Sequence, residues 1–414
     1  MPRIIFIIRQ PGRMERGMFN RKCFIVLFIF LFSDVFGESP AMQAYLQTFI
    51  RADLLGKVDI LNEASSNSFL GSSSLYEYAI QFVIDSYAQI DDLRDINDII
   101  SISKNALIYE NNAGNIDNIR ISNIINNLWK LFIEYPDPGV RGEIIIALSN
   151  IGKGNHVLIE RINNYLAQMN NMFLSGEAVD YSIVSACISA LMVLGDSSSY
   201  PALFAIICSG FPEVIASESY GALVLIPGNL HQFIFNIIEK NPPNEKYAAF
   251  RSFMNSERLK IPERGQLAET ALSQSLLAGG DDADLTDMRY DAVRILSRLR
   301  WTRANTLAIR HYYIVQADYN HDLISKDRFL EAIACLGAVG NSDAALVLGL
   351  QLGLINIRTE STGVFDEEIT HEIVHSLGLI GDNAAFYHLS YVTNLPYTDY
   401  IIAAAEEAIS RLKW

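Results

Sequence analysis

The sequence predicts an all-α fold, an α-solenoid (superhelix) of stacked antiparallel helix pairs with about 41 residues per repeat. Three observations lead to this prediction. A block that opens with an acidic residue recurs along the chain, and three of the intervals between neighbouring copies are 40 to 43 residues. Apolar residues within each block follow helical spacing. The chain has 414 residues, 50% of them apolar and only 19% charged, which excludes a disordered protein and permits a long core.

Each block predicts one helix. Its acidic residue can accept hydrogen bonds from the free N–H groups of the first turn, and the glycine that closes most copies can end the helix in a left-handed conformation. Small residues in the blocks, Ala147, Ala190, Ala334 and Ser376, would let a neighbouring helix approach closely. In the clearest copy the apolar face is Ile369, Ile373, Val374, Leu377 and Ile380. The copies span 137–152 (DPGVRGEIIIALSNIG), 180–195 (DYSIVSACISALMVLG), 287–300 (DMRYDAVRILSRLR), 327–340 (DRFLEAIACLGAVG), 367–381 (EEITHEIVHSLGLIG) and 399–412 (DYIIAAAEEAISRL).

A second apolar helix comes after several of these glycines, separated from them by a few polar residues. Examples are HVLIERINNYLAQM after Gly152, YPALFAIICSGF after Gly195 and DAALVLGLQLGL after Gly340. One such helix pair cannot bury its apolar face alone, but stacked neighbours can. The repeat therefore favours one continuous array.

The blocks resemble the HEAT-repeat family, including the bacterial HEAT-like repeats of phycobilisome lyases. The resemblance rests on LGLIGD (377–382), CLGAVGN (335–341), ALSNIGKGN (147–155) and DPGVRGE (137–143). It is clear over 135–200 and 287–414, loose over 40–134 and disturbed over 227–286. The resemblance implies a superhelix of helix pairs and says almost nothing about function.

Five segments are expected along the chain: a signal peptide (1–37), divergent helical repeats (38–134), HEAT-like repeats (135–240), an irregular insertion region within the solenoid (241–286), and HEAT-like repeats with a C-terminal cap (287–414). The insertion carries prolines and a local group of basic residues. It is either a binding surface that projects from the solenoid or a solvated loop. Its basic residues are Lys246, Arg251, Arg258, Lys260 and Arg264.

Residues 1–37 predict an export signal. Basic residues come before an apolar run at 23–32 (CFIVLFIFLF), which as a helix would be about 15 Å long, half of a bilayer core of about 30 Å. Val35-Phe36-Gly37 suits a signal peptidase, so we expect cleavage after Gly37 and a periplasmic or secreted mature chain. The alternative is an uncleaved membrane anchor.

The charge balance bears on the partner. The chain has 32 Lys and Arg against 47 Asp and Glu, a net charge of -15. This argues against nucleic acid or an anionic membrane and predicts a protein partner with a basic surface. No stretch after the signal reaches 18 apolar residues, so no membrane span is expected in the mature chain. Its three cysteines, Cys187, Cys208 and Cys335, lie in apolar helical runs and predict core packing rather than disulfides or metal ligands.

One motif indicates chemistry. His371, Glu372 and His375 fit the zinc-peptidase pattern HExxH, in which two histidines on one helix face share a zinc ion and the glutamate acts as general base. A catalytic zinc needs a third protein ligand. The metzincin pattern would place that ligand at Gly381, which cannot serve. The remaining candidates are Asp382, one residue late, and Glu406 and Glu407 on a later helix.

The repeat gives a second interpretation of the same residues. Glu372 aligns with Glu331 and Glu143, where no histidine accompanies the glutamate. Glu372 is then an ordinary acid on a helix surface, and no catalytic, cofactor-binding or metal residue is predicted. Five tyrosines near the C-terminus form either an interaction surface or half-buried packing. They are Tyr312, Tyr313, Tyr391, Tyr397 and Tyr400.

The sequence as a whole predicts an exported, non-enzymatic scaffold or adaptor of the cell envelope, which binds protein through an extended HEAT-like surface and uses no cofactor. Two other functions stay open. One is a zinc-dependent peptidase that uses the HEIVH motif. The other is a structural subunit of an envelope complex.

Overall fold

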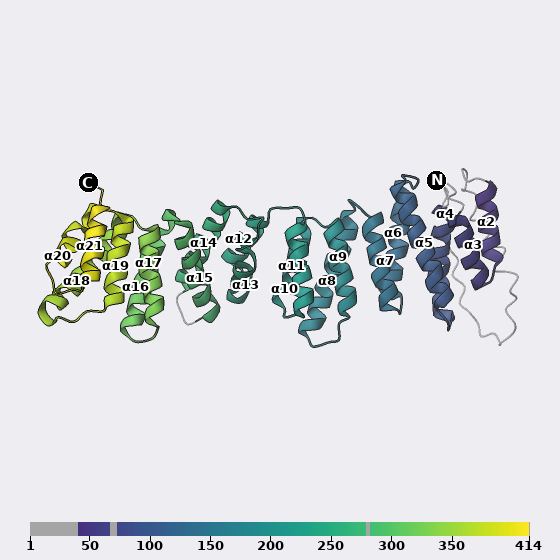
Figure 1. Cartoon of the computed structure of the whole chain (residues 1–414). Coiled ribbons are helices and arrows are strands. Elements are labelled where there is room, and N and C mark those ends of the chain that lie inside the picture. The colour runs from purple at the N-terminus through teal and green to yellow at the C-terminus, as the bar shows by residue number, and fades with distance from the viewer. Residues whose placement is uncertain (1–39, 67–72, 279–281, 414) are drawn as a thin grey trace, which may run out of the picture. The chain divides into compact units, whose positions relative to one another are not determined.

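The computed structural model describes residues 40–66, 73–278 and 282–413. Regular structure throughout these ranges is helical, with 20 α-helices and four short 3-10 turns (Figure 1). These ranges also contain one isolated β-bridge, between Asp382 and Lys413. The prediction of an all-α solenoid is confirmed. The predicted signal peptide, 1–37, lies outside the described residues.

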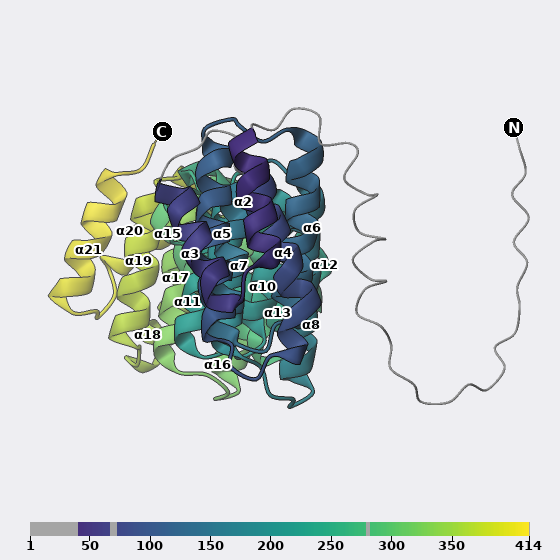
Figure 2. The same ribbon diagram turned by 90° about the vertical axis from the view of Figure 1, so that its right-hand side faces the viewer.

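The chain divides into two compact units, Met1–Tyr135 and Pro136–Trp414. In the first unit, α3 packs against α5, while α4 contacts α2, α5 and α6 (Figure 2). Alternate helices therefore stack on one another, as expected of tandem helix pairs. The helices are α2 (Pro40–Arg51), α3 (Leu54–Ser66), α4 (Ser73–Ser86), α5 (Arg94–Asn112) and α6 (Asn118–Glu134).

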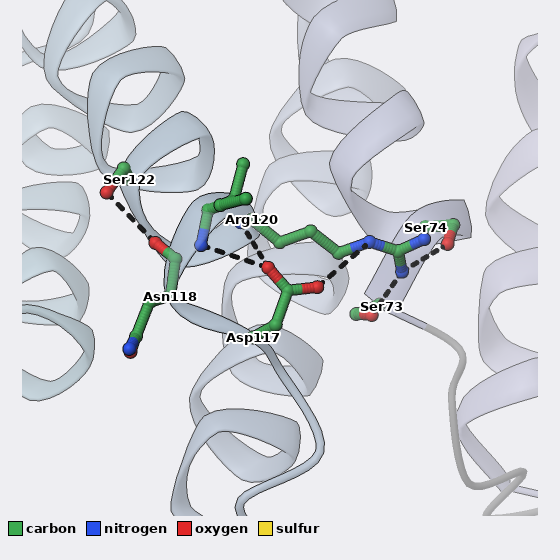
Figure 3. Close-up of polar contacts among 7 residues, drawn as sticks. Ser73, Ser74, Asp117, Asn118, Arg120 and Ser122 are labelled. Atoms are coloured by element: carbon green, nitrogen blue, oxygen red, sulfur yellow. Dashed lines mark hydrogen bonds and ion pairs between the residues drawn. The ribbon is translucent and has the colours of Figure 1, made fainter. Parts of the chain in front are cut away.

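Hydrogen bonds of Arg120 join the first turns of α4 and α6 (Figure 3), and we call this group of contacts the clasp. Asp117 caps α6 and accepts the backbone N–H of Arg120 at 2.9 Å. The Arg120 guanidinium reaches across to the start of α4 and donates to the hydroxyls of Ser74 at 2.8 Å and Ser73 at 3.3 Å. A buried hydroxyl costs free energy when it has no partner. The clasp therefore satisfies Ser73, which is buried, and fixes the spacing of the two helices.

The second unit repeats one packing pattern. Odd-numbered helices pack on one another from α7 to α11 and from α13 to α21, and each pair is completed by an even-numbered helix (Figure 1). The helices are α7 (Pro138–Ile151), α8 (His156–Leu174), α9 (Tyr181–Leu194), α10 (Tyr200–Cys208), α11 (Glu213–Leu225), α12 (Leu230–Lys240), α13 (Pro243–Phe253), α14 (Ile261–Ala278), α15 (Ala283–Leu299), α16 (Asn305–Asn320), α17 (Lys326–Val339), α18 (Ser342–Thr362), α19 (Glu367–Ile380), α20 (Phe386–Val392) and α21 (Asp399–Ser410).

The core of this unit lies between the two helix layers. On α19, Ile369, Ile373, Val374 and Leu377 are buried as predicted, and Ile380 is half-buried. Each fully buried side chain of this size contributes about 1.5–3 kcal/mol. No helix in the described ranges is long and apolar enough to cross a membrane.

The predicted acidic caps are confirmed in part. Asp137 and Asp180 cap α7 and α9 and accept first-turn backbone N–H groups at 2.8 and 2.9 Å. The other four helices of the repeated blocks start earlier than predicted. Asp366 caps α19 and Asp282 caps α15, so Asp287 lies inside its helix. These four aspartates have extended backbone, a conformation that lets the carboxylate reach back to the first turn. The predicted caps Asp327 and Asp399 are wrong, because both lie inside the first turns of α17 and α21, whose N-cap residues are Ser325 and Thr398.

The glycines end their helices in more than one way. Gly381 has the predicted left-handed conformation, with φ 68°. Gly152, Gly195 and Gly340 have φ of −91°, −64° and −72°, so the prediction is wrong for these three. Gly340 is needed for space instead, since an added Cβ would lie 2.2 Å from the carbonyl oxygen of Leu336.

Small residues set the close contacts between successive odd-numbered helices. A Cβ added at Gly337 on α17 would lie 2.6 Å from the Ser376 hydroxyl on α19. A Cβ added at Gly378 on α19 would lie 2.9 Å from the Cα of Ala408 on α21. The predicted role of Ser376 in close helix approach is therefore confirmed.

Residues 241–286 are not irregular. They contain α13, α14 and the start of α15, so the predicted insertion is wrong in its secondary structure. The prolines had suggested a loop, but Pro243 and Pro262 stand in the first turns of α13 and α14. A proline is tolerated there, since the N–H that it lacks would have no helical partner.

Arg258 ties this segment back to α11. Its guanidinium, in the turn after α13, donates to the carbonyl oxygens of Val224, Ile226 and Gly228, each at 2.8 Å. These carbonyls belong to the last turn of α11 and the residues after it, which have no partner within a helix. Phe253 of α13 also stacks on Tyr220 of α11, with ring centroids 5.2 Å apart.

Other basic residues of the segment also bond to the protein itself. Lys246 donates to the carbonyl oxygen of Glu239 at 3.1 Å and to the Gln274 side chain at 2.9 Å. Arg264 donates to the carbonyl oxygen of Ser256 at 2.8 Å. The contacts of Arg258, Lys246 and Arg264 indicate a structural role for much of this basic group.

Candidate functional site

Helix α19 carries the HEIVH residues on its exposed side. The side chain of Glu372 is 25% exposed and that of His375 is 46% exposed. Glu372 accepts a long hydrogen bond from the Ser376 hydroxyl, at 3.4 Å, and lies 3.7 Å from Nδ1 of His375. The apolar residues between them, Ile373 and Val374, point into the core. The helical period therefore places the motif on the exposed side of α19, the helix that packs against α21 (Figure 2).

The two histidines take part in aromatic contacts. The rings of His371 and His375 are parallel within 3°, with centroids 6.1 Å apart. Tyr400 of α21 stacks on His371, with centroids 4.4 Å apart and planes 12° apart. Offset stacking of this kind is favourable for aromatic rings. His371 is thus held between a neighbour on its own helix and a tyrosine on the next odd-numbered helix.

The described residues do not assemble a three-ligand zinc centre. No group of three or more His, Cys, Asp or Glu side chains in these ranges is placed to hold a metal ion. Two of the candidate third ligands are engaged elsewhere. Asp382 accepts hydrogen bonds from Ser342 and from the backbone N–H of Ala384, and Glu407 pairs with Arg411. The structure brings His371 and His375 onto one face, but this part of the chain supplies them with no third protein ligand.

An open cleft of about 520 Å³ lies over the start of α19. This volume is within the range of small-ligand sites. Residues of three successive odd-numbered helices form its walls, one from α17, four from α19 and one from α21. The lining residues are Leu330, Glu367, Glu368, His371, Glu372 and Tyr400.

The cleft is acidic, and one lysine offsets part of its charge. Lys326 of α17 forms ion pairs with Glu368 and Asp366, the latter at 3.3 Å. Hydrogen bonds from the ammonium group to Glu368 and then to Asp366 raise the pKa of Lys326, so it stays charged. Glu367 accepts a hydrogen bond from Thr398 at 2.7 Å. A cationic group in this cleft would meet the carboxylates of Glu367 and Glu372.

The preceding repeat shows how such a carboxylate is neutralised. Glu331 on α17, which aligns with Glu372, accepts hydrogen bonds from the guanidinium of Arg294 on α15 at 3.1 and 3.2 Å. The residue that aligns with Arg294 on α17 is Ala334, forty positions later. Within the described part of the chain, no lysine or arginine pairs with Glu372. The cleft lies at the repeat where this internal arginine is missing.

The HEIVH pattern pointed to His371 and Glu372 but not to the cleft. Leu330, Glu367 and Glu368 were not singled out, because only the fold brings α17 next to this part of α19. Among the tyrosines, Tyr312 and Tyr397 are buried and Tyr391 is half-buried, whereas Tyr313 and Tyr400 are exposed. The repeat aligns Glu331 with Glu372, but it does not show that Arg294 pairs with Glu331, so the missing arginine could not be recognised from the sequence.

Buried polar groups elsewhere belong to the core. Cys187 and Cys335 are buried free thiols, and burial raises the pKa of Cys335 to about 11. His311 on α16 is fully buried, and neither ring nitrogen has a hydrogen-bond partner among the described residues. Burial, with a smaller effect of Arg289, lowers the pKa of His311 to about 3. Cys187 and Cys335 pack in the core as predicted, whereas Cys208 is only half-buried.

Comparison with known proteins does not assign a family. No protein-family model and no curated protein matches the chain. The chain is similar to one from the solved structure described as "A conserved phosphorylation switch controls the interaction between cadherin and beta-catenin in vitro and in vivo". That likeness covers 93% of this chain and 94% of the other at 11% identity, with a TM-score of 0.34, which carries no argument on function. Membership of the HEAT-repeat family stays a prediction.

Proposed function

We propose that this chain is a protein-binding scaffold that takes a basic side chain of its partner into the cleft on α19. One observation carries the proposal. Glu372 is three-quarters buried at the cleft, while Glu331, its counterpart one repeat earlier, is held by Arg294 from the preceding odd-numbered helix. A partner's arginine would occupy at Glu372 the place that Arg294 occupies at Glu331.

Arginine fits the cleft better than lysine. Its planar guanidinium can donate two parallel hydrogen bonds to one carboxylate, as Arg294 does to Glu331. The exposed ring of Tyr400 offers a flat aromatic surface at the wall, and Leu330 offers apolar contact to the methylene groups. Because Glu372 is only 25% exposed, such a pair would be partly desolvated and stronger than a pair in open solvent.

The wider assignment rests on the sequence. We propose that the chain is exported, that its signal is cleaved after Gly37, and that it acts as a HEAT-like scaffold or adaptor in the cell envelope. The net charge of -15 supports a partner with a basic surface and association that weakens with salt. Cell fractionation and the N-terminal sequence of the recovered chain test export. A chain retained in the cytoplasm with residues 1–37 attached would contradict it.

Calorimetric titration tests the cleft directly. The probe is the tripeptide Arg-Arg-Arg with blocked termini, and Lys-Lys-Lys serves as the comparison. We expect Arg-Arg-Arg to bind more tightly, and Glu372→Gln to weaken its binding by about 10- to 100-fold, as for a lost hydrogen bond between charged groups. The glutamine keeps the size of the side chain and removes the charge.

A matched control is available at the same repeat position. Glu143 is exposed on α7 and lies outside the cleft, so Glu143→Gln should leave the affinity unchanged. It changes the net charge by the same amount as Glu372→Gln and therefore removes the long-range effect of charge from the comparison. Equal weakening by the two variants, or no detectable binding of Arg-Arg-Arg by the unmodified chain, would contradict the proposed function.

A further inference from the structure

Helix α18 has an apolar face that the described part of the chain leaves uncovered. Leu346, Leu350, Leu354 and Ile357 are 53%, 64%, 65% and 63% exposed. The opposite side of the helix is already packed, with Ala345, Leu348 and Leu352 among its buried residues. A helix that is apolar on every side is normally buried on every side. We name the four exposed residues the α18 stripe.

The stripe is bracketed by opposite charges on the same helix face. At 3.6 residues per turn, Asp343 lies one turn before Leu346, and Arg358 lies one turn after Leu354. Both residues are exposed. The face therefore reads, from its N-terminal to its C-terminal end, as an acid, a run of leucines and a base.

This order of residues is complementary to itself when reversed. If two copies of α18 cross antiparallel with Leu350 at the twofold axis, Leu346 of each copy faces Leu354 of the other. The same register places Asp343 of each copy across from Ile357 of the other, next to the neighbouring Arg358. A twofold interface needs one surface that matches itself in this way.

We propose that the α18 stripe is the contact surface of a homodimer, formed by antiparallel pairing of α18 from two copies of this chain. Charge complementarity selects the second copy as the occupant. Phe386 and Tyr387 on the adjacent α20 are also exposed aromatic side chains. The proposal is independent of the arginine cleft, which lies on α19.

Sedimentation equilibrium of the purified full-length chain tests for the dimer. We expect a dimer at micromolar concentration and a monomer for Leu350→Glu, because this substitution brings two glutamates together at the twofold axis. Leu55→Glu is the control, since Leu55 is 62% exposed but lies on α3. A monomeric unmodified chain, or equal dissociation of both variants, would overturn the proposal. Circular dichroism verifies that each variant is folded.

A charge exchange tests the antiparallel register. Asp343→Arg alone and Arg358→Asp alone each place like charges together twice per dimer, and we expect each to raise the dimer Kd about tenfold or more. In an equimolar mixture of the two variants, both charge contacts between unlike copies become attractive. We therefore expect a heterodimer close to the unmodified chain in affinity. A dimer that Leu350→Glu disrupts but that this mixture does not restore would refute the antiparallel pairing.

Discussion

Replacing Arg258 with methionine should loosen the junction between α11 and α13. The guanidinium makes three hydrogen bonds of 2.8 Å to carbonyl oxygens at the end of α11. A hydrogen bond to a charged group contributes about 1.5–3 kcal/mol, and partial exposure of this guanidinium reduces each contribution to about 1 kcal/mol. We therefore expect the free energy of local opening at this junction to fall by about 3 kcal/mol. Methionine is chosen because it keeps the apolar stem of the arginine side chain.

Hydrogen exchange is the appropriate assay, because repeat arrays need not unfold in one step. If the free energy of local opening falls by about 3 kcal/mol, the amides at the end of α11 and in α13 should exchange about 100-fold faster. Arg251→Met is the control, since Arg251 is exposed in the same segment. If the two variants exchange at the same rate, Arg258 does not stabilise this junction.

The second unit supports three further predictions. Gly378→Ala should lower the free energy of unfolding by about 1–3 kcal/mol, because the new Cβ would lie 2.9 Å from the Cα of Ala408; an unchanged thermal midpoint would contradict this. Stability should fall with acid between pH 6.5 and 3, since His311 is neutral in the fold but takes up a proton when unfolded. The free energy of unfolding measured in urea titrations should fall by about 1.3 kcal/mol between pH 7 and pH 5.5. A His311→Leu variant whose free energy of unfolding falls by the same amount would contradict this. Binding of Arg-Arg-Arg should weaken as salt rises, and calorimetry showing a salt-independent affinity would argue against an ionic contact at Glu372.

The repeat made the architecture predictable. Apolar spacing on α19 and the aspartate caps of α7 and α9 are local properties that a sequence displays directly. Prolines at 243 and 262 were misleading, since a proline occurs both in loops and in the first turn of a helix. Glycine was ambiguous in the same way, because it is required for close packing at Gly340 and for a left-handed turn at Gly381.

The candidate site was only partly accessible from sequence. The HEIVH motif drew attention to α19, but the cleft depends on Leu330 and Tyr400, which the stacking of α17 and α21 brings to it. Its acidity depends on an arginine that α17 lacks at the position matching Arg294. An absence of this kind is visible only after the Arg294–Glu331 pair is seen in space.

Arginine recognition at Glu372 is tested most directly by a crystal structure of the chain with blocked Arg-Arg-Arg. We expect one guanidinium in the α19 cleft, donating to the Glu372 carboxylate and lying against Tyr400, in the manner of Arg294 at Glu331. A peptide bound on another face, with the cleft left empty, would show that Glu372 is not the recognition site.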